Sequence, residues 1–180
     1  MSIEIRDAAY RKAHQQAAAL LAGLNDPIAA MASVAAVLFD SIPAVSWVGF
    51  YRVVDTELLR VGPYQGPVGC LEIPFGNGVC GAVARSGEPL VVPDVHAFPG
   101  HIACDAQAQS EIVVPVTDPS GTLVAVLDVD SHQPANFDDR DLEHLQQIVA
   151  LLRPCLEDRK RVTTTGPAQT ASPDRTAPDD

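Results

Sequence analysis

The spacing of apolar residues along the chain changes abruptly at about residue 46. Before that point, apolar side chains in residues 27–40 recur every three or four positions, which predicts a helix with one buried stripe. Residues 6–23 are rich in alanine and also predict a helix. After residue 46, the segments 47–53 and 57–61 show strand patterning and predict a β-hairpin. Helices followed by strands in one chain favour helices packed on one face of a sheet.

The remaining elements complete an α+β domain. The pattern predicts a short strand at 70–73, a helix at 79–86, a strand at 89–92, a polar loop at 93–110, strands at 111–117 and 122–130, and a helix from Asp138 that ends at residues 159–161. We expect a mostly antiparallel central sheet, with helices on one face and loops on the other. Residues 1–161 form this single domain, and residues 162–180 lack aromatic side chains and predict a disordered tail.

The charge of the chain argues against two classes of partner. Its formal net charge is −11 and it has only 12 Lys and Arg residues, which disfavours binding to nucleic acid or anionic lipid. The longest weakly polar stretch, residues 28–39, is too short to span a bilayer, and the N-terminus has no signal-peptide pattern. We therefore expect a cytoplasmic protein with no membrane partner. The oligomeric state stays open, and a homodimer is compatible with these features.

Three carboxylates border the long loop. Asp128 and Asp130 lie two residues apart in a strand and so share one face, about 7 Å apart. Glu111 begins the neighbouring strand. The strand alternation places Leu123, Ala125, Leu127 and Val129 under the helices and Val124, Val126, Asp128 and Asp130 on the opposite face. Acids at strand ends are often merely solvated, but three beside one long loop favour a functional site.

Trp47 and Tyr51 share a strand face because they are four residues apart. Both could belong to the core, where aromatic side chains are common. If their face is the acidic one, they form a cage beside the three carboxylates. Such a cage suits a small cation, for example the ammonium group of an amino acid.

Cysteines form the other reactive group. Cys70, Cys80 and Cys104 lie in or beside the loop-rich middle of the chain, whereas Cys155 lies among apolar residues of the last helix and is expected to pack. Cys80 starts the short helix, whose dipole is expected to lower the pKa of its thiol. Cys70 follows a glycine-rich loop, which we expect to be mobile. Four cysteines in a reducing compartment seldom form a structural disulfide framework.

A zinc site is an alternative use of these cysteines. Cys70, Cys80, His96, His101 and Cys104 together hold enough ligands. Structural zinc sites usually contain ligand pairs two to four residues apart, and only His101 and Cys104 have that spacing. We therefore expect no metal.

The motifs of the chain resemble those of a known family. The runs in question are Trp47-Val48-Gly49-Phe50-Tyr51, Gly62-Pro63-Tyr64-Gln65-Gly66, Gly76-Asn77-Gly78-Val79-Cys80-Gly81, residues 93–105, Ser110-Glu111-Ile112-Val113-Val114-Pro115 and Leu127-Asp128-Val129-Asp130-Ser131. They resemble the free methionine-(R)-sulfoxide reductases, which are single-domain GAF proteins, in order and spacing from about residue 5 to 158. Departures are mild: Tyr64 stands where the family often has Phe, and Val68-Gly69 precedes Cys70 where Ala often stands.

The resemblance implies a role for each matching residue. It implies that Cys104 is the catalytic cysteine, Cys70 the resolving cysteine, and Cys80 a third cysteine able to join disulfide exchange. The positions that match the family's substrate-binding residues are Trp47, Tyr51, Glu111, Asp128 and Asp130. The implied substrate is free methionine-(R)-sulfoxide, the implied fold is a single GAF-like domain, and the implied reductant is thioredoxin or a similar dithiol, with no other cofactor.

The residues suit this chemistry independently. A thiolate can attack a sulfoxide sulfur only if an acid protonates the oxygen, and crowded carboxylates such as Glu111 and Asp128 raise one another's pKa and so retain a proton. The attacking cysteine is left as a sulfenic acid, which a second thiol converts to a disulfide. The alternative function is a non-catalytic GAF domain that senses a small molecule. Three cysteines in the loop-rich region have no role in that alternative.

Overall fold

The structure is a computed structural model, which describes residues 3–100 and 105–156. Its centre is a six-stranded sheet with the order β3-β2-β1-β6-β5-β4, in which every neighbouring pair is antiparallel. The strands are β1 Trp47–Asp55, β2 Leu58–Gln65, β3 Glu72–Pro74, β4 Leu90–Val92, β5 Ser110–Thr117 and β6 Leu123–Ser131. The antiparallel α+β fold is confirmed. The predicted tail, residues 162–180, lies outside the described residues.

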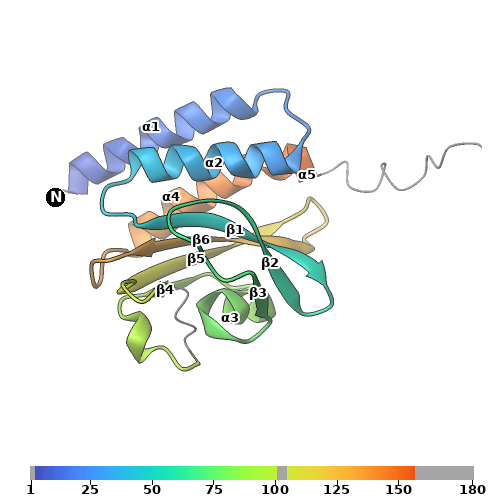
Figure 1. Ribbon diagram of the computed structural model, residues 1–180. Helices are drawn as coiled ribbons and strands as arrows, with labels where there is room; N and C mark the ends of the chain where they lie inside the picture. The colour runs from blue at the N-terminus through green and yellow to red at the C-terminus, as the bar shows by residue number, and fades with distance from the viewer. Residues whose placement is uncertain (1–2, 101–104, 157–180) are drawn as a thin grey trace, which may run out of the picture.

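Helices lie on both sides of the sheet (Figure 1). The helices are α1 Ile3–Leu21, α2 Pro27–Ser41, α3 Gly78–Ser86, η1 Val95–Ala97, α4 Asp139–Ala150 and α5 Arg153–Leu156. One face carries α1, α2, α4 and α5, whereas α3 packs on the other face, which the sequence assigned to loops alone. Of the helices in residues 3–100 and 105–156, none has the length and apolar character needed to cross a membrane.

Capping residues begin two of these helices as their positions predict. The carboxylate of Asp26 accepts hydrogen bonds from the backbone N–H groups of Ile28 and Ala29, and Pro27 occupies the first helical turn. Asp138 and Asp141 form a reciprocal capping box at the start of α4.

The last predicted helix is interrupted. The continuous helix expected from Asp138 to residues 159–161 is divided: α4 ends at Ala150, and the separate turn α5 begins at Arg153, while residues 157–161 lie outside the described chain. Pro154 lacks the N–H that would bond to the carbonyl of Ala150, and its ring crowds that carbonyl. Cys155 lies on α5, is buried as predicted, and donates a hydrogen bond from its thiol to the carbonyl of Leu24.

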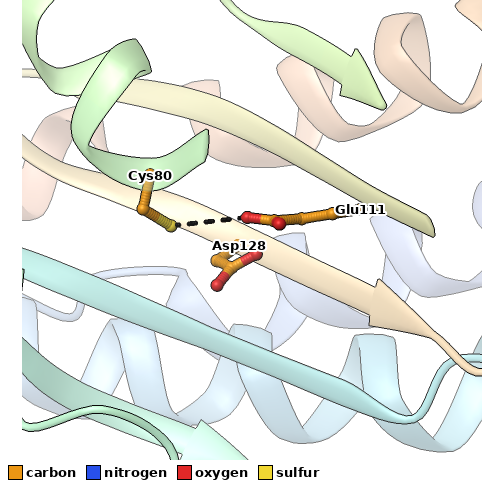
Figure 2. Close-up of side chains that lie close together, drawn as sticks. All are labelled: Cys80, Glu111 and Asp128. Atoms are coloured by element: carbon orange, nitrogen blue, oxygen red, sulfur yellow. Dashed lines mark hydrogen bonds between the residues drawn. The ribbon is translucent and has the colours of Figure 1, made fainter. Parts of the chain in front are cut away.

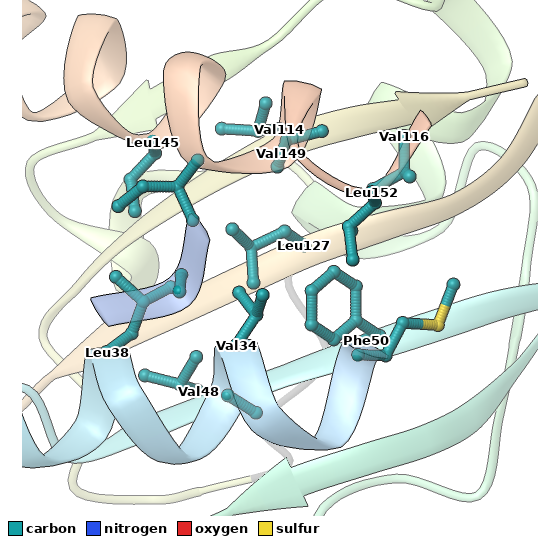
Figure 3. Close-up of a cluster of buried hydrophobic side chains, with 14 of the residues drawn as sticks. Val34, Leu38, Val48, Phe50, Val114, Val116, Leu127, Leu145, Val149 and Leu152 are labelled. Atoms are coloured by element: carbon teal, nitrogen blue, oxygen red, sulfur yellow. The ribbon is translucent and has the colours of Figure 1, made fainter. Parts of the chain in front are cut away.

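The main core lies between the sheet and the α1–α2–α4 layer. Side chains from α2, α4, β1, β5 and β6 meet there, among them Val34, Leu38, Val48, Phe50, Leu127, Leu145 and Leu152 (Figure 3). A second, smaller core lies on the opposite face beneath α3, and it contains Trp47, Tyr51, Val79, Cys80, Val83, Val113 and Val126. Successive residues of β1 therefore point alternately to the main core and to the smaller core, as the two-residue period of a strand requires.

A β-bulge at the start of β6 changes the face of the sheet to which the first side chains of this strand point. Val116 pairs with Ala125 and Thr117 pairs with Leu123, so Val124 has no partner of its own. Val124 consequently packs in the main core and Leu123 packs against the smaller one, the reverse of the predicted alternation. From Ala125 onward the predicted alternation is correct, and Asp128 stands on the face of the smaller core.

Candidate functional site

Strand pairing brings the predicted acids and aromatic residues onto one face of the sheet. Direct partners in an antiparallel ladder have their side chains on the same face. Asp130 is such a partner of both Glu111 on β5 and Trp47 on β1. Asp128 pairs with Gly49 in the same way. The face that carries α3 therefore holds all three carboxylates and, from β1, the aromatic pair.

Two pockets open on this face. The larger lies beneath the start of α3, and the smaller lies beneath the segment between β2 and β3. Both are lined by the side of the sheet just described, and the four residues that they share are Tyr51, Asp105, Asp128 and Asp130. Cys80 and Glu111 line the larger pocket, whereas Trp47 and Gly69 line the smaller.

Cys80 is buried against two of the carboxylates. It points from the first turn of α3 toward the sheet, and its Sγ lies 3.9 Å from Oε1 of Glu111, beside Asp128 (Figure 2). Burial, and then the charges of Asp128 and Glu111, raise the pKa of this thiol well above its ordinary value. The predicted lowering by the helix dipole is wrong, because desolvation and two adjacent acids outweigh a partial charge. Cys80 is therefore a thiol that donates to Glu111.

The three carboxylates hold protons at unusually high pH. Burial, followed by the charges of Asp128 and Asp130, raises the pKa of Glu111 well above its ordinary value. Burial likewise raises the pKa of Asp128 to about 6, and it raises the pKa of Asp130 well above its ordinary value. Oδ1 of Asp128 is buried and has no hydrogen-bond partner within the described chain. Near neutral pH the cluster can therefore donate a proton to a ligand oxygen.

The aromatic side of the site depends on a glycine. The Trp47 ring stacks on Tyr51 and on Tyr64, with centroid distances of 5.7 and 5.3 Å. A Cβ at Gly49 would lie 2.2 Å from Cη2 of Trp47, so only glycine lets the indole lie flat over β1. Tyr64, where Phe is frequent in the family that the sequence resembles, supplies the same ring face.

The loop before Cys70 packs tightly against the same indole. Nε1 of Trp47 donates a hydrogen bond to the carbonyl of Pro67, at 3.0 Å. A Cβ at Gly69 would lie 3.0 Å from the hydroxyl oxygen of Tyr51 and 3.2 Å from Cζ2 of Trp47. The glycine at position 69 thus allows the loop to approach both aromatic rings closely. The loop leads into Cys70, which is half-buried against the smaller core and disulfide-bonded.

One pocket residue was missed by the sequence reasoning. Asp105 lines both pockets, although it was quoted only as part of a longer motif. Its position directly after Cys104 was the signal that could have identified it. Cys104 itself, with His101, lies outside the described residues.

The same cluster has the composition of a metal-binding set. Within residues 3–100 and 105–156, the donor atoms of Cys80, Glu111 and Asp128 lie within 4.8 Å of one another. These donors could share a divalent ion, but the raised pKa values mean that protons compete for the same atoms. The zinc alternative considered from the sequence used a different set, of which His101 and Cys104 lie outside the described chain.

Comparison with known proteins identifies close relatives of this arrangement. Residues 26–157 match the family model of the GAF domain. The chain is 41% identical to the free methionine-R-sulfoxide reductase of Escherichia coli K12, over 77% of this chain and 82% of the relative. It is 40% identical, with a TM-score of 0.81, to the X-ray structure of free methionine-R-sulfoxide reductase from Neisseria meningitidis in complex with its substrate, covering 89% of this chain and 94% of that one.

A more distant likeness shows the fold alone. The GAF domain of a phosphoenolpyruvate-protein phosphotransferase from Coxiella burnetii superposes with a TM-score of 0.73 over 85% of this chain and 96% of that chain, but at 18% identity. The fold is therefore shared with proteins of other names.

Proposed function

The chain belongs to the GAF domain family and, within it, to the free methionine-R-sulfoxide reductases, and we propose that it reduces free L-methionine-(R)-sulfoxide to methionine. The observation that carries this proposal is the group of buried, proton-retaining carboxylates beside the stacked Trp47 and Tyr51. A sulfoxide requires both features: an acid for its oxygen and a surface for its methyl and methylene groups.

The proposed reaction begins at Cys104. Its thiolate attacks the sulfoxide sulfur while Glu111, assisted by Asp128, gives a proton to the oxygen. The oxygen is transferred to the cysteine, so that methionine leaves and Cys104 becomes a sulfenic acid. In this scheme burial keeps Glu111 protonated, and the negative charge of Asp128 raises its pKa further.

The reductive half of the cycle uses a second thiol. The thiol of Cys70 condenses with the sulfenic acid of Cys104, releases water and leaves a disulfide. The disulfide-bonded state of Cys70 supports its use as this resolving residue. Thioredoxin or a similar dithiol then reduces the disulfide through a mixed disulfide. Cys80 is the weaker candidate for first resolver, because its thiol is buried and protonated.

A coupled assay tests the proposal directly. Purified protein is mixed with thioredoxin, thioredoxin reductase and NADPH, and NADPH oxidation is followed after addition of separated R and S diastereomers of methionine sulfoxide. We expect turnover of the free R diastereomer, and little for the S diastereomer or an N-acetylated substrate. Equal rates on free and N-acetylated substrate would contradict the stated specificity. Binding of methionine sulfoxide without any methionine release, even from the reduced protein, would point to the sensor alternative.

Two further proposals concern the setting of this activity. We place the protein in the cytoplasm, where thioredoxin is kept reduced and thiols persist. A homodimer is the assembly to test first, by sedimentation of the full chain at several concentrations.

A further inference from the structure

Asp105 and His132 form a hydrogen-bonded pair at the edge of the site, and the proposed reaction does not use this pair. Oδ2 of Asp105 lies 2.8 Å from Nε2 of His132, and its other oxygen accepts a hydrogen bond from the backbone N–H of Gln107. His132 directly follows β6, whereas Asp105 belongs to the loop that enters β5. The pair therefore ties this loop to the end of the strand that carries Asp128 and Asp130.

We propose that Asp105 binds the α-ammonium group of the free amino-acid substrate, and that His132 is a positioning residue that holds Asp105 in place. This inference rests on the proposed function and specifies how the site selects a free amino acid. It assigns a different task to Asp105 from that of the three deeper carboxylates.

Position supports this division. Asp105 lines both pockets together with Asp128 and Asp130, and 17% of its side chain is exposed, whereas Asp128 is 6% exposed. An acid at the rim of a pocket meets the charged end of a substrate, while acids at the base meet its other end. Each carboxylate oxygen can accept two hydrogen bonds, so the contacts with Gln107 and His132 leave room for an ammonium donor.

Charge supports it as well. An ammonium group binds best to a carboxylate that is already ionised, because a neutral acid must first lose its proton. Hydrogen bonds from the backbone N–H of Gln107 and from His132 lower the pKa of Asp105. Its carboxylate is therefore anionic in the folded protein at neutral pH. Burial raises the pKa values of Glu111, Asp128 and Asp130 instead. Of the acids that line the two pockets, Asp105 is thus the one whose pKa is lowered, which makes it the most fully ionised partner for a cation.

The test compares two substrates that differ only in the ammonium group. They are methionine sulfoxide and 4-(methylsulfinyl)butanoic acid, which keeps the sulfoxide and the carboxylate but lacks the amine. In Asp105→Asn, which preserves an acceptor for the Gln107 N–H, we expect kcat/KM for methionine sulfoxide to fall by about 10- to 100-fold, through KM. On the analogue, we expect the variant and the wild type to agree within about twofold, because no charge is lost there.

His132 is tested through the same ratio. His132→Ala should raise KM for methionine sulfoxide by a smaller factor, about 3- to 10-fold, and should leave KM for the analogue unchanged. His132→Gln, whose amide can donate to Asp105, should restore most of the loss. Asp94→Asn is the matched control, since Asp94 also accepts a backbone N–H in a turn of this region but lines neither pocket.

Two outcomes would overturn the assignment. An equal loss on both substrates in Asp105→Asn would show that Asp105 acts on the neighbouring cysteine or on the loop, not on the ammonium group. No loss on either substrate would show that another group binds the ammonium. A wild-type protein that reduces neither compound would instead refute the proposed function itself.

Discussion

Glu111 on β5 and Asp130 on β6 are direct partners in an antiparallel ladder on the same face of the sheet, where Glu111 is buried and Asp130 half-buried. Two acids placed opposite each other destabilise a sheet when both are charged. Protonation relieves this repulsion, since desolvation, followed by the charge of Asp128, raises the pKa of each. A costly pair of this kind is typical of a site that uses the retained proton.

Replacement of Glu111 tests that use. Glu111→Gln keeps the size of the side chain but cannot release a proton to the sulfoxide oxygen. We expect methionine release in a single turnover to slow by about 100-fold or more, with folding retained because apolar residues on both sides hold β5. Rapid-quench measurement of methionine provides the rate. Glu143→Gln, on the exposed side of α4, is the control and should react at the wild-type rate.

The raised pKa of Asp128 should make the free energy of unfolding depend on pH. Burial raises its pKa from 3.8 to about 6, so the folded state retains a proton that the unfolded chain releases. The stability from this group is present below about pH 4 and is lost as the pH rises to about 6. Asp128→Asn removes the titration, and its free energy of unfolding relative to wild type should rise by on the order of 2 kcal/mol between about pH 4 and pH 8. Urea denaturation of both proteins measures this, and a constant difference across the range would contradict it.

Replacement of Gly49 should change the affinity for substrate while all the reactive side chains remain present. A Cβ at this position would lie 2.2 Å from Cη2 of Trp47 and 2.5 Å from Cβ of Tyr64. Gly49→Ala should therefore displace the indole, lower stability by about 1–3 kcal/mol and raise KM by roughly 10-fold. Gly23→Ala is the control: Gly23 has φ +75° and nothing within 4 Å of the added Cβ, so it should lose stability through backbone strain but keep its KM. Equal KM values in the two variants would show that the indole does not contact the substrate.

The cysteines should separate into distinct roles. Cys104→Ser should abolish methionine release even in a single turnover. Cys70→Ser should release one methionine per chain, then stall with thioredoxin and leave a sulfenic acid on Cys104. Cys80→Ser should be partly impaired, and Cys155→Ser should be nearly normal, because its hydroxyl can still donate to the carbonyl of Leu24.

Mass spectrometry after reaction with dimedone locates the sulfenic acid in these variants. The label is expected on Cys104. A label on Cys70 after one turnover would reverse the roles of the two residues.

Local sequence patterns were sufficient for most of the fold. The cap at Asp26, the apolar stripe of α2 and the alternation in β6 from Ala125 onward depend on neighbours within a few residues. The same alternation correctly placed Asp128 and Asp130 on one face. It failed at Val124, because a bulge arises from the pairing of two strands and has no signature in either one alone.

The chemistry of the site required the tertiary structure. Cys80 stands at the start of a helix, so its local sequence suggested a lowered pKa. The packing of α3 onto the sheet buries the thiol against Glu111 and Asp128 and raises that pKa instead. Asp105 was equally hidden, because its partner His132 and the pockets it lines are formed by residues distant along the chain.

The sequence by itself therefore determined which segments are helices and strands, which faces are apolar, and which reactive residues the chain owns, since these follow from periodicity and residue type. Only the tertiary structure decided which of those residues meet and in what protonation state. Strand pairings such as Trp47 with Asp130 join segments far apart in the chain. Desolvation depends on every neighbour that excludes water, so the pKa of a buried group is defined only once the whole fold is in place.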